Sequence, residues 1–122
     1  MHALINTMTQ AQIEALVRLL LAGRRQDGVV SMKESDEFDA QLAGLPWRAK
    51  TDLRFFVITE AARIRNTMAL HRASFIAEQC AQFHTPDQRA AVIDLLQRVI
   101  GADGAAAGEN AFLAEVKSAL KN

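Results

Sequence analysis

The chain has 122 residues, which is long enough to bury a core. Of these residues 50% are hydrophobic and only 23% are charged, a composition that excludes intrinsic disorder. Fourteen basic residues balance fourteen acidic ones, so no net charge directs the chain to nucleic acid or to an anionic membrane. Its single cysteine, Cys80, cannot form an intramolecular disulfide and is typical of a reducing compartment.

Neither a signal peptide nor a membrane span is visible in the sequence. Residues 1–15 lack a basic start followed by an apolar core, and no apolar run approaches the roughly 20 residues that a span requires. We therefore expect a soluble, cytoplasmic protein of one domain over residues 1–122, without membrane insertion.

The first two predicted helices lie in the N-terminal third. The first runs from Thr9 to about Arg25, and Thr9 with Gln12 has the spacing of a capping box. The apolar residues that recur at helical spacing predict its buried stripe, namely Ile13, Leu16, Val17, Leu20 and Leu21. The second begins at Ser31, and Gly44 and Pro46 end it.

The rest of the chain is also predicted to be helical. Residues 47–83 are helical, and the best candidate for a break is Asn66-Thr67 because both residues are good N-caps. The sequence Thr85-Pro86-Asp87-Gln88 is a strong helix start, and the helix after it ends at Asp103-Gly104. A last helix runs from about Gly108 to Leu120. We expect an all-α, single-domain bundle of five to seven helices.

The most informative pattern is a phrase that occurs twice. A shift of 76 positions places Asp27-Gly28 on Asp103-Gly104. Each copy reads as an apolar helix, an Asp-Gly turn and a second helix with an acid near its start, Glu34 in one copy and Glu109 in the other. The pattern predicts an internal repeat of one helix–loop–helix unit. The two units span about residues 9–43 and 85–121.

The ligand register of an EF-hand does not fit either loop. With Asp27 at loop position five, Glu34 falls on position twelve, but positions one and three become Gly23 and Arg25, which offer no oxygen side chain. Taken singly, each loop is explained more simply as a turn followed by a helix, because Asp-Gly is a common turn pair and the helix dipole favours an acid at a helix start without any metal. The doubled pattern keeps a second interpretation open, in which carboxylates from both loops share one hard cation.

The phrases LLLAGRRQDGVVSMKESDEF and LLQRVIGADGAAAGENAFL resemble the paired units of the tellurite-resistance TerB family, which is similar to the N-terminal region of membrane-anchored DnaJ-type co-chaperones. The resemblance covers most of the chain. It implies a compact α-helical module for tellurite resistance and stress response, with an acidic surface that binds a divalent cation such as Ca²⁺ or Mg²⁺. Carried over by position, the metal-binding residues are Asp27, Glu34, Asp103 and Glu109.

A basic stretch supports an alternative function. Residues 48–72 hold six basic side chains against Asp52 and Glu60, an excess of four: Arg48, Lys50, Arg54, Arg63, Arg65 and Arg72. Three of them, Arg54, Arg65 and Arg72, would share one face of a continuous helix. Such a face would suit phosphates or an acidic partner, and a protein-interaction or scaffolding domain that binds no metal would use it in this way. The simpler interpretation is a solvated helix face without a binding role.

No catalytic motif points to an enzyme. The sequence contains no glycine-rich phosphate loop, nucleophile elbow or HExxH motif. Cys80 and His84 are four residues apart, but a catalytic dyad also requires an orienting group and a pocket, and we expect Cys80 to be a buried thiol. We therefore expect a non-catalytic module whose partner is another protein, with nucleic acid disfavoured.

Overall fold

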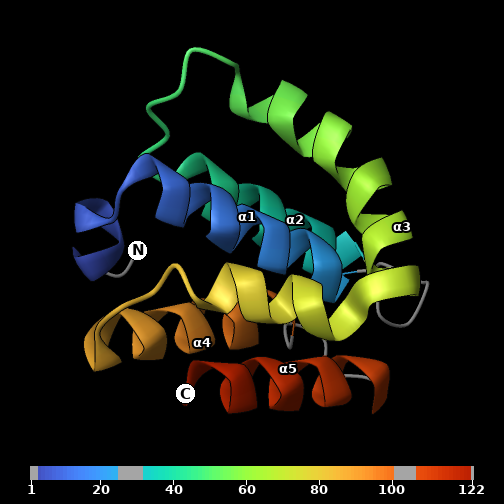
Figure 1. The fold of residues 1–122 in the computed structure, drawn as a ribbon. Helices are drawn as coiled ribbons and strands as arrows, with labels where there is room; N and C mark the ends of the chain where they lie inside the picture. Colours follow the sequence, from blue (N-terminus) through green and yellow to red (C-terminus); the bar gives the residue numbers. More distant parts are fainter. Residues whose placement is uncertain (1–2, 25–31, 101–106, 122) are drawn as a thin grey trace.

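A computed structural model describes residues 3–24, 32–100 and 107–121, with the backbone alone for residues 3, 24, 32–37 and 107–109. This part of the chain contains no strand, which confirms the all-α prediction, and its five α-helices fall within the predicted number (Figure 1). In chain order the elements are a short 3₁₀ helix η1 (Ala3–Thr7), α1 (Gln10–Arg24), α2 (Met32–Ala43), α3 (Leu53–Cys80), α4 (Pro86–Ile100) and α5 (Ala107–Leu120).

Helix α1 is the centre of the bundle. It lies between the start of α3 and the α4–α5 pair in Figure 1, and it contacts each of the other four helices. The predicted stripe is buried, but burial extends almost around the helix and also includes Ala15, Leu19, Ala22 and Gly23. No helix in the described residues is long and apolar enough to cross a membrane.

The predicted capping box at the start of α1 is confirmed. The backbone N–H of Thr9 donates to Oε1 of Gln12 at 3.0 Å, and the N–H of Gln12 donates to Oγ1 of Thr9 at 3.2 Å. These bonds satisfy backbone donors that have no partner inside the helix. Met8 and Ile13, which flank the cap, are both buried, as a hydrophobic staple requires.

Helix α4 begins in the same way at the equivalent position of the repeat. Oγ1 of Thr85 accepts the N–H of Gln88 at 3.1 Å, while Oε1 of Gln88 accepts the N–H of His84. The two caps also meet, because Nε2 of Gln12 donates to Oε1 of Gln88 at 3.3 Å. The residues that the 76-position shift relates therefore lie side by side at the starts of α1 and α4.

The predicted division of the middle segment was wrong. Residues 47–52 are not helical, and α3 passes through Asn66-Thr67 without a break. Oγ1 of Thr67 donates to the carbonyl oxygen of Arg63 at 2.9 Å, so its hydroxyl is satisfied inside the helix rather than at a cap. The helix instead kinks at His71, where φ is −140° and ψ is 46°.

The kink separates two halves with different environments. After it, Phe75 and Ile76 are buried, and Arg72 forms an ion pair of 2.6 Å with Glu115 of α5. Before it, α3 curves away over α1 (Figure 1). The bend at His71 thus allows one half of α3 to pass over α1 while the other half packs against α5.

The last turns of α1 and α4 are in close contact at Gly23. A Cβ atom built on Gly23 would overlap Cδ1 of Ile100 and lie 2.9 Å from Cε2 of Phe112 in α5. The absence of a side chain at this position therefore allows three helices to approach closely, and no unusual backbone angle is involved. The contact brings the two helix ends that precede the Asp-Gly loops next to each other.

We predict that Gly23→Ala lowers the free energy of unfolding by about 1–2 kcal/mol, because overpacking outweighs the better helix propensity of alanine. Ile100→Val removes the atom that the new methyl group would overlap. In the Gly23→Ala background this second substitution should therefore cost less than it does in the wild type. Denaturant unfolding of the four proteins in this cycle measures the coupling, and additive costs would contradict the contact.

Candidate functional site

The predicted cation-binding residues fall where the structure gives no side chains. Asp27 and Asp103 lie outside the described residues, and Glu34 and Glu109 are placed only by their backbones, in α2 and α5. Ser31, the predicted cap of the second helix, also lies outside. Among the described residues no group of three or more His, Cys, Asp or Glu side chains could hold a metal ion.

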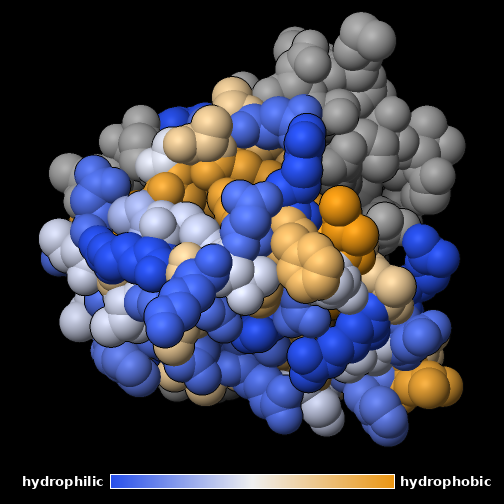
Figure 2. Space-filling view, turned by 90° about the horizontal axis from the view of Figure 1, so that it is seen from above, coloured by the Kyte–Doolittle hydropathy of each residue, from blue (hydrophilic) through white to orange (hydrophobic). Residues whose placement is uncertain are grey.

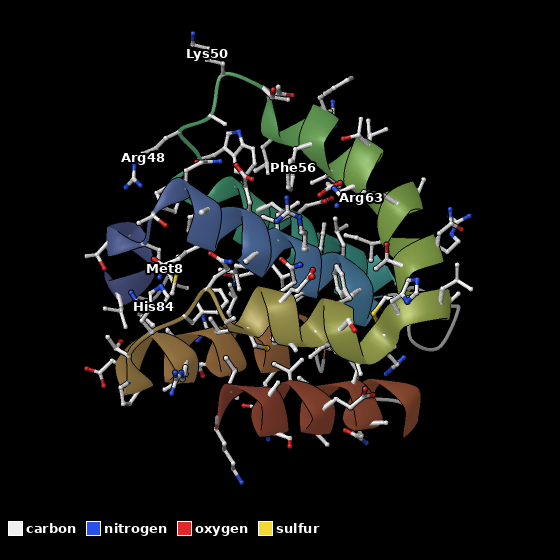
Figure 3. All side chains as sticks on the ribbon, viewed as in Figure 1. Met8, Arg48, Lys50, Phe56, Arg63 and His84 are labelled. Atoms are coloured by element: carbon white, nitrogen blue, oxygen red, sulfur yellow. The ribbon has the colours of Figure 1, made fainter. Side chains whose placement is uncertain are left out.

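The predicted basic face is divided by the structure. Arg72 lies beyond the kink and is paired with Glu115, and Nη1 of Arg48 donates to the carbonyl oxygen of Met8 at 2.9 Å, so both hold the fold together. Arg54 and Arg65 remain exposed on the first half of α3. Figure 3 shows Lys50 pointing away from the body of the molecule in the turn before this helix.

A cluster of charged side chains joins α1 to the first half of α3. Nε of Arg18 donates to Oε1 of Glu60 at 2.7 Å, and Arg63 reaches the other carboxylate oxygen of Glu60 at 3.3 Å. Nη1 of Arg18 also donates to Oε1 of Gln79, at 3.4 Å, and Glu14 lies 3.6 Å from its Nη2. The Glu60 side chain is only 9% exposed, so its charge depends on these partners.

The same cluster lines a concavity of about 460 Å³ in the bend of α3. Its buried polar groups satisfy one another: both oxygens of Glu60 accept bonds, and the guanidinium of Arg18 also lies 5.4 Å from the centre of the Phe56 ring. A ligand entering here would have to break these bonds. The arrangement is therefore a clamp between helices rather than an open binding site.

The first half of α3 is otherwise weakly anchored. Between Leu53 and Leu70 the buried residues are Glu60 and Ile64 alone. Phe55 and Ile58 are 60% and 65% exposed, and Figure 2 shows orange apolar side chains interrupting the hydrophilic surface seen from above. Exposed large apolar side chains next to one another mark candidate interaction surfaces.

An open apolar groove runs beside these residues, between α2 and the first half of α3. Its volume is about 580 Å³. The lining is apolar except for Asp39 and Arg54, and comprises Phe38, Leu42 and Ala43 of α2 with Leu53, Val57 and Ile58 of α3. We refer to these residues as the α2–α3 groove. It combines an apolar floor with charged side chains at the rim, which is the usual composition of a groove that binds a partner helix.

Cys80 does not form a catalytic dyad with His84. The thiol is buried, and burial raises its pKa to about 11, so it stays protonated and unreactive at neutral pH. His84 is exposed, and its backbone N–H is used in the cap of α4. The expectation that Cys80 is a buried thiol is confirmed.

The α2–α3 groove was missed by the sequence analysis, although the sequence contains a signal for it. The run LRFFVI places apolar side chains at five of six successive positions, Leu53 to Ile58. Successive positions point around the whole circumference of a helix, so one neighbouring surface cannot bury them all. The run therefore indicated that apolar side chains would remain exposed unless further elements covered this helix.

The described structure defines the class of protein as an all-α bundle in which two equivalent helices, α1 and α4, pack side by side. Comparison with protein-family models, with curated proteins and with solved structures gives no significant match for the chain. A function therefore has to be argued from the chain itself.

We predict that Glu60→Leu lowers the free energy of unfolding by about 1–3 kcal/mol, because it removes the closest charged acceptor of Arg18. The matched control is Arg98→Gln, which breaks an ion pair whose side chains are 47% and 55% exposed and should cost less than about 1 kcal/mol. Adding Arg18→Met to Glu60→Leu should recover part of the loss. Equal unfolding midpoints for Glu60→Leu and the control would show that the clamp contributes nothing.

Proposed function

We propose that the chain is a non-catalytic interaction module that binds an acidic, amphipathic helix of a partner protein in the α2–α3 groove. The observation that carries the proposal is the outward position of Phe55 and Ile58, at 60% and 65% exposure, beside an apolar groove. A helix that inserts apolar side chains at positions i, i+3, i+4 and i+7 would cover both features at once.

The charge of the partner is inferred from the basic side chains around this surface. Arg54 lines the groove and is exposed. Lys50 and Arg65 are also exposed, in the turn before α3 and two turns beyond Ile58 on the same helix. Among the side chains that the structure describes, the exposed acids nearby are Asp39 and Asp52. The excess of positive charge would attract an acidic partner during association, and added salt would weaken this attraction.

A second copy of this chain is a poorer occupant of the groove. Pairing the first halves of two α3 helices would place the arginines of one copy against those of the other. Like charges brought together at an interface oppose association. The proposal therefore assigns the groove to a different chain, and concentration-dependent dimerisation through Ile58 would contradict it.

We predict that a labelled model peptide with leucines on one helical face and glutamates on the other binds the protein measurably at micromolar concentrations. A peptide with the same leucines, but with lysines in place of the glutamates, should bind at least tenfold more weakly. Fluorescence anisotropy at low and at physiological salt measures both, and equal affinities for the two peptides would overturn the charge argument.

Two substitutions test the place of binding. Ile58→Asp changes an exposed side chain on the edge of the groove, so it should abolish peptide binding while the far-UV circular dichroism stays the same. Arg54→Glu should lower the affinity for the acidic peptide and raise the affinity for the lysine peptide. Arg98→Glu, a matched charge change on α4, should alter neither, and an unchanged affinity in Ile58→Asp would refute the groove as the binding site.

A second function, suggested by the TerB resemblance, is divalent cation binding in a tellurite-resistance or stress-response module. The observation that favours it is the contact between Gly23, near the end of α1, and Ile100, at the end of α4. In the sequence, Asp27 and Asp103 follow these two helix ends within a few residues. Carboxylates that start from adjacent helix ends can reach one ion, together with Glu34 and Glu109.

We expect calorimetric titration with Ca²⁺ or Mg²⁺ to give saturable heat that is lost in both Asp27→Ala and Asp103→Ala, because the two loops would share one ion. A loss in only one of these variants would indicate a single-loop site. Absence of heat at millimolar ion would contradict cation binding and would leave the α2–α3 groove as the functional surface.

A further inference from the structure

A second concavity lies on another part of the molecule, between the start of α4 and the end of α5. It has a volume of about 430 Å³, within the range of small-ligand pockets. Its floor is apolar and is formed by Ala90 and Ile93 of α4 with Leu120 of α5. These helices run antiparallel here (Figure 1), so the first turns of one lie against the last turns of the other.

Three cations surround this floor: Arg89, Lys117 and Lys121. None of them forms an ion pair with an acid in the part of the chain that the structure describes. Nε of Arg89 donates to the carbonyl oxygen of Phe83 at 3.1 Å, which fixes the guanidinium at the rim and leaves its terminal nitrogens available. In a chain with no net charge, this is a local excess of positive charge over an apolar surface.

We propose that this concavity binds an anion that carries an apolar chain, with a medium-chain fatty acid as the ligand class. The carboxylate would be held by charge-assisted hydrogen bonds from Arg89 and the two lysines, and the alkyl chain would cover Ala90, Ile93 and Leu120. The proposal is independent of the α2–α3 groove, since the two surfaces share no residue.

An alkyl chain fits the floor better than a peptide does. The side chains that line the floor offer no hydrogen-bonding group, so the amides of a bound peptide would lose water without gaining partners. The polar groups of the site are confined to its rim, which matches a ligand with one charged end and an apolar remainder.

The test uses decanoate, below the concentration at which it forms micelles, and amide chemical shifts of the full chain. We expect saturable shifts confined to residues 86–93 and 116–121. Acetate, which has the charge without the chain, and decyltrimethylammonium, which has the chain with the opposite charge, should bind at least tenfold more weakly. Equal binding of decyltrimethylammonium, or shifts that concentrate at the α2–α3 groove, would overturn the proposal.

Two variants separate the roles of rim and floor. The double substitution Lys117→Gln and Lys121→Gln should weaken decanoate binding at least fivefold. Ala90→Glu, at an exposed position of α4, should abolish decanoate binding while the far-UV circular dichroism stays the same. Arg98→Gln on the same helix α4 should leave the affinity unchanged. Retention of wild-type affinity in the lysine double variant, or tighter binding of an apolar tripeptide carboxylate than of decanoate, would show that the assignment is wrong.

Discussion

The burial of α1 on nearly all sides is the constraint to which the other helices adapt. From Ile13 to Gly23, every side chain except Glu14 and Arg18 is buried, so α1 needs neighbours around most of its circumference. Gly23 allows α4 and α5 to approach at one end. At the other end the caps of α1 and α4 share a hydrogen bond between Gln12 and Gln88. The two central helices are thus fixed against each other at both ends.

The polar side of α1 explains the behaviour of α3. Gln10, Glu14 and Arg18 lie four residues apart and are linked to one another, so they form a polar stripe along this helix. The first half of α3 passes over that stripe and meets it with a buried carboxylate, Glu60, rather than with an apolar face. An apolar face there would remove the closest acceptor of the half-buried Arg18 side chain, which costs more than forming the ion pair does.

The exposed apolar residues of α3 follow from the same arrangement. Because Glu60 occupies the contact with α1, Phe55 and Ile58 point outward. Leu53 and Val57 line the groove between α3 and α2 and do not fill it. The features proposed as a partner-binding surface are therefore tied to the clamp between Arg18 and Glu60. Beyond His71 the helix returns to ordinary apolar packing through Phe75 and Ile76, and the surface proposed to bind partners ends there.

The sequence by itself determined the helices that have strong local signals. Thr9 with Gln12 and Thr85 with Gln88 fixed two helix starts, because a cap depends only on residues within one turn. Helical periodicity identified the core of α1, and the 76-residue repeat related it to α4. Tertiary structure alone decided the kink at His71, the pairing of Arg72 with Glu115 and of Arg18 with Glu60, and the α2–α3 groove. Each of these features depends on contacts between segments that lie tens of residues apart in the sequence. Neither local helix propensity nor residue spacing contains that information.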